Sequence, residues 1–304
     1  MTSFRSMAMR GLRAFSLVLA ALAATAVPAT AAEAPKEFVF TAIPDQDARL
    51  LNERFGVVAK ALETALGVPV RYVPVKSYAA AVTAFVNDEV QLAWFGGFSG
   101  VQARLRQPGA VAIAQGVEDP KYYSYLIAHT DTKLKPFTKL PDSLKGLSMT
   151  FGDKGSTSGR LMPEYFFRQH YGEAPEKTFS RVGFSGDHTR TIQLVQSGAY
   201  QLGVVGYTAW DSEVKRGTVD ASKVQVLWKS PAYPDYQWTV RGDTDARFGA
   251  GFTAKLTKAL LDMKDPDLLS RFPRTGFIPA SNADFQPIID TARSVGLIED
   301  QAKP

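Results

Sequence analysis

The stretch Gly155-Ser156-Thr157-Ser158-Gly159 decides the fold, with Phe151-Gly152-Asp153-Lys154 before it and Arg160-Leu161-Met162-Pro163 after it. This pattern is typical of a strand that ends in a loop of small residues, which then opens a helix. The first backbone N–H groups of a helix have no acceptor within the helix, so they can bind an anion. The sequence therefore predicts an anion site at residues 155–159.

Strands and helices alternate on both sides of this loop. The predicted strands lie at residues 37–43, 68–75, 90–95 and 146–151, and the predicted helices at residues 48–66, from 78 onward and from 156 to 171. The helix at 48–66 shows apolar residues at helical spacing and stops at Gly67. Short links between alternating strands and helices favour an α/β fold with parallel strands.

A segment of this alternation occurs twice. With an offset of 110 residues, the segment 81–96 aligns with the segment 191–206 without a gap. Gln91-Leu92 then matches Gln201-Leu202, Gly96 matches Gly206, and Tyr78 faces His188. Any helix that precedes a buried strand could align in this way. A true repeat would give two similar lobes around a shared cleft.

Two strand-like runs are candidates for the connections between such lobes. Residues 125–129 are followed by a polar segment, and residues 236–241 follow Pro231 and Pro234. Lobe one would then contain residues 32–129 and 237–304, and lobe two would contain residues 130–236.

The first 31 residues have the features of a secretory signal peptide. Three arginines precede an apolar run from Ala14 to Val27, and Ala29-Thr30-Ala31 is a small-x-small cleavage pattern. The apolar run is short for a membrane span. Cleavage after Ala31 would leave 304 − 31 = 273 residues outside the cytoplasm, and we expect a periplasmic protein.

Composition excludes several function classes. The formal charge of +5 becomes 5 − 3 = +2 once the three leader arginines are removed, so neither nucleic acid nor a membrane surface is an expected partner. The chain has no cysteine and three widely spaced histidines, which leaves little material for a metal site. We expect no cofactor.

Several blocks together resemble one known family. They are Ile43-Pro44-Asp45, Tyr78, Trp94-Phe95-Gly96, Phe151-Gly152-Asp153 with Ser156-Thr157-Ser158-Gly159, and Phe184-Ser185-Gly186-Asp187-His188. In this order they resemble the phosphonate and phosphite periplasmic binding proteins of ABC importers. The runs 74–78 and 92–97 are similar to members described as substrate-binding proteins of selenate transporters.

The resemblance implies a type II, two-lobed Venus flytrap with a mixed, mostly parallel sheet in each lobe. It also implies a monomer that delivers a small tetrahedral oxyanion to an inner-membrane permease. Carried over block by block, the ligand residues would be Ser156, Thr157, Ser158 and His188 from lobe two, and Tyr78, Trp94, Phe95, Gly96 and Asp45 from lobe one.

Each of these residues also has a purely structural interpretation. The serines could cap a helix, Tyr78 could belong to an apolar helix face, and one of Trp94 and Phe95 should point into the core. Asp45 could simply cap the helix that follows it. His188 follows Gly186-Asp187 at a helix start, and as an imidazolium it would bind anions less tightly as the pH rises.

Two features that the sequence lacks narrow the expected class of ligand and the expected role of the protein. Relatives that bind aminophosphonates tend to place an acid after the second buried strand, whereas this chain has Gly206-Tyr207, with Asp211 only later. This difference favours a bare oxyanion of the selenate, phosphonate, phosphite or phosphate class. No Gly-x-Ser-x-Gly elbow accompanies Ser156 and His188, so an enzyme is not expected. A protein that presents its ligand to a sensor kinase remains the alternative.

Overall fold

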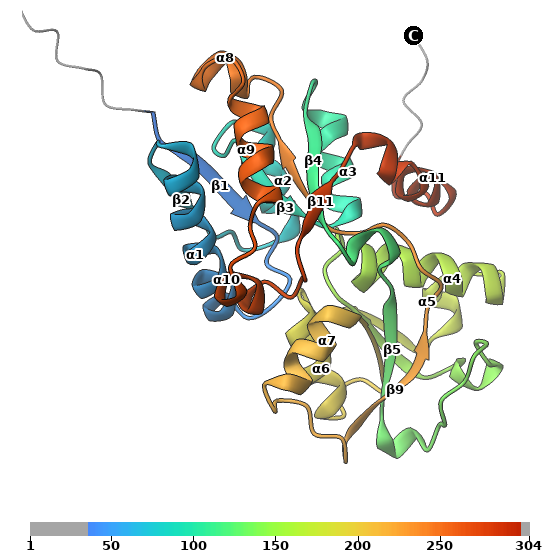
Figure 1. Ribbon diagram of the computed structural model, residues 1–304. Coiled ribbons are helices and arrows are strands. Elements are labelled where there is room, and N and C mark those ends of the chain that lie inside the picture. The colour runs from blue at the N-terminus through green and yellow to red at the C-terminus, as the bar shows by residue number, and fades with distance from the viewer. Residues whose placement is uncertain (1–35, 299–304) are drawn as a thin grey trace, which may run out of the picture. The chain divides into compact units, whose positions relative to one another are not determined.

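The computed structural model describes residues 36–298, and these residues form two mixed β-sheets with helices packed on them (Figure 1). The strands are β1 Phe38–Ala42, β2 Val70–Tyr72, β3 Leu92–Phe95, β4 Val111–Gly116, β5 Ser124–His129, β6 Ser148–Phe151, β7 Arg181–Phe184, β8 Leu202–Gly206, β9 Val224–Lys229, β10 Gln237–Val240 and β11 Phe277–Pro279. The helices are α1 Ala48–Leu66, α2 Tyr78–Val86, α3 Gly97–Arg106, α4 Met162–Tyr171, α5 Pro175–Thr178, α6 His188–Gln196, α7 Tyr207–Lys215, α8 Thr244–Phe248, α9 Phe252–Leu261, α10 Pro266–Arg271 and α11 Gln286–Ser294.

The first sheet has the strand order β11-β4-β10-β3-β1-β2. Its strands β1, β2 and β3 are parallel, whereas β10 lies antiparallel to both β3 and β4. The strand expected at 68–75 is shorter, β2, and it lies at the sheet edge, where the flanking Pro69 and Pro74 are tolerated. Helix α1 has the predicted bounds because Asp47 caps its first turn and Gly67 ends it at φ 73°.

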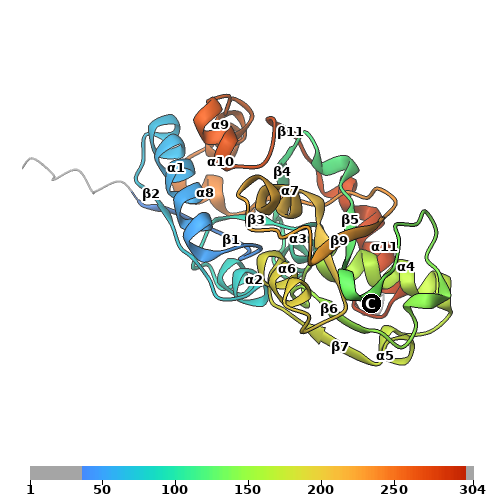
Figure 2. The same ribbon diagram turned by 90° about the horizontal axis from the view of Figure 1, so that it is seen from below.

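The second sheet has the order β7-β6-β8-β5-β9. Its strands β6, β7 and β8 are parallel, and β5 lies antiparallel to both β8 and β9. Val204 of β8 packs in one apolar cluster with Phe167 of α4, and the adjacent Val205 packs in another with Ile192 of α6. Helices α4 and α6 therefore cover opposite faces of this sheet (Figure 2).

The predicted α/β class with mixed sheets is confirmed, but parallel pairs do not predominate. Two of the five strand pairs in the first sheet and two of the four in the second are parallel, among residues 36–298. The reason is topological. Strands β5 and β10 each follow a segment that crosses between the sheets, and each enters its sheet in the reverse direction.

The crossing segments lie at residues 117–123 and 230–236. They run side by side, because Tyr233 N–H donates to the Tyr122 carbonyl at 2.9 Å and Asp235 N–H donates to the Asp119 carbonyl at 3.0 Å. The predicted lobe boundaries, 129/130 and 236/237, stay a proposal. The pairing of β5 in the second sheet supports a first boundary several residues earlier.

The structure supports the internal repeat. Helix α2 leads into β3 as α6 leads into β8, and the two helices begin at the matched caps Ser77 and Asp187. The matched glutamines also make equivalent hydrogen bonds to the backbone of a neighbouring strand. Gln91 Oε1 accepts the Val39 N–H at 3.0 Å in the first sheet, and Gln201 Oε1 accepts the Ser148 N–H at 2.9 Å in the second.

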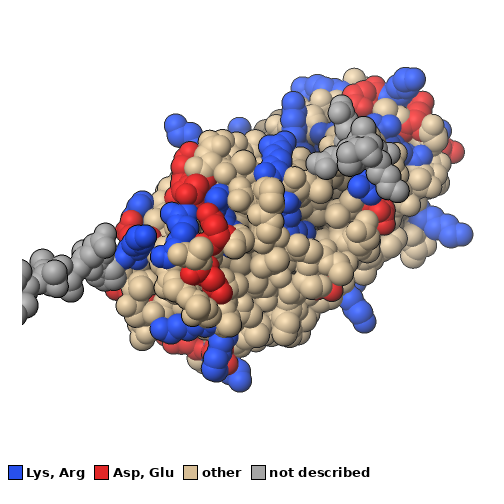
Figure 3. All heavy atoms as spheres, turned by 90° about the horizontal axis from the view of Figure 1, so that it is seen from above, with Lys and Arg blue, Asp and Glu red and all other residues tan. Residues whose placement is uncertain are grey.

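Charges of both signs are interspersed on the face shown in Figure 3. This mixture agrees with the small net charge expected from the sequence. Among the residues that the structure describes, no helix is both long and apolar enough to cross a bilayer. The predicted signal peptide, residues 1–31, lies outside the described residues.

Candidate functional site

The loop after β6 is held in a fixed conformation by its own polar groups. Ser156 is the N-cap of a π-helical turn at Thr157–Leu161, and its Oγ accepts the Gly159 N–H at 2.9 Å. The Gly152 N–H donates to the Gly159 carbonyl at 2.8 Å, which brings two glycine backbones together. Ser156, Thr157 and Ser158 are each at most 2% exposed. Capping and anion binding are thus compatible, since Ser156 uses a lone pair for the cap and keeps its proton to donate.

Thr157 and Ser158 connect this loop to other elements. Thr157 Oγ1 accepts the Phe98 N–H at 2.9 Å. Phe98 lies at the start of α3, which follows β3, so this bond links the loop after β6 to a helix beside the first sheet. The carbonyl of Ser158 accepts the Ser124 Oγ–H at 2.7 Å. The loop is therefore positioned from both sides by hydrogen bonds.

His188 begins α6 and lies against the loop. Its Nδ1 accepts the Gly206 N–H at 3.3 Å, so the ring proton belongs on Nε2, which lies 3.5 Å from Ser158 Oγ. Burial lowers the pKa of His188 to about 4, although the charge of Asp45 opposes the shift. The expected imidazolium is therefore wrong, because burial favours the neutral ring. His188 is a neutral Nε2–H donor at pH 7.

Tyr78 begins α2 and meets the same loop from the first sheet's side. It is 1% exposed, and its Cβ lies 3.1 Å from the position that a Cβ atom on Gly155 would take. The Asp153 carboxylate accepts the Gly155 N–H at 2.7 Å. Burial raises the pKa of the Tyr78 phenol, and the nearby charges of Asp45 and Asp153 add to this shift. The two helix starts that the repeat aligned, at Tyr78 and His188, thus converge on this loop.

The predicted residues at the end of β3 divide between site and core. Phe95 packs against Phe85 of α2, with ring centroids 5.6 Å apart, and belongs to the core. Trp94 stacks on Tyr236 at 5.5 Å, within the aromatic cluster behind the site. Gly96 lies at the contact itself, since a Cβ there would lie 3.2 Å from both Thr157 Oγ1 and Asp235 Oδ1. The glycine permits this close approach.

Asp45 lies at the contact rather than in a helix cap. The cap of α1 is Asp47, whose side chain accepts the Arg49 and Leu50 N–H groups. The Asp45 carbonyl instead accepts the His188 N–H at 2.9 Å, and its Oδ2 accepts the Tyr236 hydroxyl at 3.0 Å.

Asp235 is a residue of this site that the sequence analysis missed. It lies in the second crossing segment, 1% exposed, and its Oδ1 accepts the Gly97 N–H at 2.8 Å. Burial raises its pKa to about 7, against the lowering effects of Gly97, Thr157 and Ser158. Within the described part of the chain, its Oδ2 has no hydrogen-bond partner. The site thus contains a buried carboxyl group that comes from the second crossing segment and not from the residues after β8.

The site therefore combines several donors with buried carboxyl groups, of which Asp235 keeps one oxygen without a partner among the described residues. The donors are the helix start at 157–158, the hydroxyls of Ser156, Ser158 and Tyr78, and the Nε2–H of His188. Such a set fits a small tetrahedral oxyanion. Among the described residues, no cluster of three or more His, Cys, Asp or Glu side chains could hold a metal ion.

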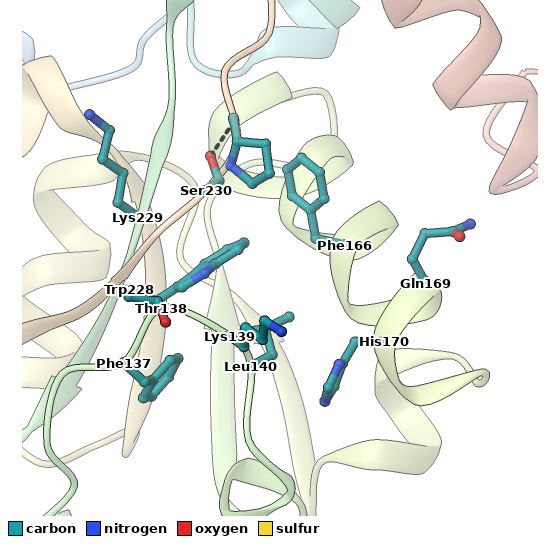
Figure 4. Close-up of a pocket in the computed structure, with 11 residues that line it drawn as sticks. Phe137, Thr138, Lys139, Leu140, Phe166, Gln169, His170, Trp228, Lys229 and Ser230 are labelled. Carbon is teal, nitrogen blue, oxygen red and sulfur yellow. Dashed lines mark hydrogen bonds between the residues drawn. The ribbon is translucent and has the colours of Figure 1, made fainter.

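A cavity of about 660 Å³ lies away from this site (Figure 4). Phe137, Leu140, Phe166 and Trp228 form its apolar walls, and His170 and Gln169 of α4 lie at one side. None of the predicted ligand residues lines it. The polar cluster around the Ser-Thr-Ser loop is therefore the better candidate for ligand binding.

Two mixed sheets joined by two adjacent crossing segments, with a polar site at the contact between their helix starts, define a type II periplasmic binding protein. Residues 40–285 match the family described as "ABC transporter, phosphonate, periplasmic substrate-binding protein". The chain belongs to this family of periplasmic substrate-binding proteins, whose members are not enzymes.

Individual relatives agree with this assignment. The chain is 38% identical over 271 residues to the probable ABC transporter phosphite binding protein PhnD1 of Prochlorococcus marinus (strain MIT 9301), which covers 87% of this chain and 91% of the relative. It is 28% identical over 212 residues to the phosphonates-binding periplasmic protein of Escherichia coli (strain K12), which covers 68% of this chain and 61% of the relative. The solved structure of PhnD1 with methylphosphonate matches with a TM-score of 0.83 and 37% identity, over 87% of this chain and all of that chain.

Proposed function

We propose that this protein captures phosphite or a small phosphonate at the Ser-Thr-Ser loop and delivers it to an ABC permease in the inner membrane. The family and the donor set support an oxyanion ligand. Of the nine residues expected from the sequence, Ser156, Thr157 and Ser158 form this loop, and His188, Tyr78 and Gly96 lie against it. Asp45 lies beside His188, whereas Trp94 and Phe95 pack among aromatic side chains. Their direct contact with ligand stays a prediction.

One observation favours phosphite and phosphonates over selenate as ligands. Asp235 offers Oδ2, a buried acceptor without a partner, to a site that is otherwise rich in donors. Phosphite and alkylphosphonates titrate close to neutral pH, so their singly protonated forms are populated there and can donate a proton to the charged carboxylate. Selenate and sulfate have no such proton, and their oxygens face the charged Asp235 as acceptor against acceptor. A missing hydrogen bond at a buried acceptor costs the full desolvation of that group.

Calorimetry on the purified protein at pH 7 tests this proposal, with phosphite, methylphosphonate, phosphate, selenate and sulfate as ligands. We expect micromolar or tighter binding of phosphite or methylphosphonate, and binding of selenate and sulfate weaker by at least about tenfold. The proposal fails if no phosphorus oxyanion binds, or if selenate binds more tightly than both.

The proposal has three further parts. They are delivery of the ligand to a permease, a monomeric state, and export to the periplasm by the predicted leader. The family supports the permease and the periplasm. Size-exclusion chromatography with light scattering tests the monomer. The comparisons give no support to the sensor-kinase alternative, and we do not propose it.

A further inference from the structure

Tyr122 and Gly206 fit together at one edge of the oxyanion site. A Cβ atom at Gly206 would lie 2.5 Å from the Tyr122 hydroxyl oxygen and 3.0 Å from Ser158 Oγ. The phenol therefore occupies the space in which a side chain at position 206 would begin. The chain has no acid at the end of β8, and there is a steric reason for this. Tyr122 fills the space that such a side chain would need.

Tyr122 also has contacts on the side that faces away from the oxyanion site. Its side chain is fully buried, and its hydroxyl is 2.6 Å from Thr208 Oγ1 on α7. Its ring packs on Tyr207 and Tyr236, with centroids 4.7 and 5.4 Å away. Tyr207 and Thr208 in turn line a groove of about 360 Å³ between α7 and the segment 269–275. The phenol thus lies beside Gly206 on one side and hydrogen-bonds to Thr208, a lining residue of this groove, on the other.

The groove contains carboxylates that could bind a cation. Glu118 uses Oε1 to accept the Thr275 N–H at 3.0 Å, and its buried Oε2 has no partner among the described residues. Burial raises the pKa of Asp211, the second carboxyl group of the groove. Arg274, which also lines the groove, is neutralised by Asp119, with Nη2 2.8 Å from Oδ1 and Nε 2.8 Å from Oδ2. Lys215 is the remaining charged group there.

We propose that Tyr122 is a specificity-determining residue that separates the oxyanion site from the Glu118–Asp211 groove and so excludes ligands with a tail. The inference rests on the proposed function, because it concerns the substituent on the same oxyanion. With the phenol in place, the site admits phosphite and methylphosphonate. Without it, the tail of a longer phosphonate reaches the groove, where an ammonium group meets Glu118 and Asp211.

The test compares wild type, Tyr122→Phe and Tyr122→Ala by calorimetry with methylphosphonate, propylphosphonate and 3-aminopropylphosphonate. We expect wild type and Tyr122→Phe to reject both propyl ligands, since the ring remains. Tyr122→Ala should bind both at least tenfold more tightly than wild type does and keep methylphosphonate binding within about tenfold. Tyr122→Leu serves as a second opening variant if the alanine variant melts too early.

The carboxylates are tested in the Tyr122→Ala background. Glu118→Gln and Asp211→Asn, singly and together, should weaken 3-aminopropylphosphonate binding about fivefold or more and leave propylphosphonate binding unchanged. The inference is overturned if folded Tyr122→Ala and Tyr122→Leu, which still bind methylphosphonate, reject tails as wild type does. The ammonium part fails if the carboxamide variants bind both propyl ligands as before. Failure of the proposed function would appear separately, as wild type that does not bind methylphosphonate.

Discussion

The hydroxyl oxygen of Tyr122 lies 2.5 Å from the position that a Cβ atom on Gly206 would take. This distance is too short for two non-bonded heavy atoms, so the pair allows a glycine at 206 and a tyrosine at 122 but no larger residue at 206. The next nearest atom of Tyr122, Cε1, is 3.2 Å from the same position. The conflict therefore belongs mainly to the hydroxyl oxygen.

A double-mutant cycle on this pair gives the first prediction. Gly206→Ala should destabilise the protein by about 1–3 kcal/mol, because it overpacks a buried position. In the Tyr122→Phe background the same change should cost less, since the clashing oxygen is gone. Chemical denaturation of all four proteins measures the coupling. Equal costs in the two backgrounds would contradict the prediction.

Asp235 should control the choice between protonated and fully ionised anions. Asp235→Asn replaces the free acceptor Oδ2 with an amide, which can donate. We expect phosphite and methylphosphonate binding at pH 7 to weaken by about 10- to 100-fold, and selenate and sulfate binding to strengthen. Calorimetry with the same five anions measures both directions.

Asp211→Asn is a matched control for that substitution, because it makes the same chemical change on α7, outside the described oxyanion site. It should leave all five affinities unchanged. If Asp235→Asn changes selenate and phosphite affinities in the same direction, Asp235 acts only on the structure of the site.

The pH dependence of binding should report Asp235 rather than His188. The carboxyl group of Asp235, with its pKa raised to about 7, is neutral below that pH and charged above it. A charged Asp235 faces a fully ionised anion as acceptor against acceptor, so selenate affinity should fall above pH 7, by up to about tenfold per pH unit. Selenate does not titrate in this range, and Asp235→Asn should flatten its profile from pH 7 to 9.

Between pH 5.5 and 6.5 we expect no comparable change, because the pKa of His188 lies lower, at about 4. A step in methylphosphonate affinity near pH 6 that persists in Asp235→Asn would show that the ligand-bound site charges His188 after all.

His188 should also shape stability in acid. Its pKa falls from 6.5 to about 4 on folding, so between these values the unfolded chain binds a proton that the folded protein does not. The His188 contribution is therefore fully present above pH 6.5 and is lost as the pH falls toward 4, by about 3 kcal/mol in total.

His188→Asn removes this contribution while its Oδ1 can still accept the Gly206 N–H. The difference in unfolding free energy between wild type and His188→Asn, measured by urea denaturation, should shrink as the pH falls from 7 to 4. A difference that stays constant over this range would contradict the assigned pKa.

The sequence by itself determined the local features of this protein. Helix α1 was predicted at its observed bounds, and the Ser156 cap, the α2 and α6 starts and the family could be read from residues close together in the chain. Periodicity, capping and turn residues act over one or two turns, so they are visible in a single sequence. Elements such as α3, β4 and α7 were missed, because their packing is set by the sheets around them.

Only the tertiary structure decided the chemistry at the site. Asp235 reaches Gly97 across 138 residues, Tyr122 reaches Thr208 across 86, and neither carries a local motif. The charge of His188 likewise depends on burial by distant segments, which lowers its pKa and reverses the protonation state expected from residue type. Desolvation and steric fit are properties of atoms brought together by folding, so a linear sequence gives the Ser-Thr-Ser loop but not the acid and the phenol that select its ligand.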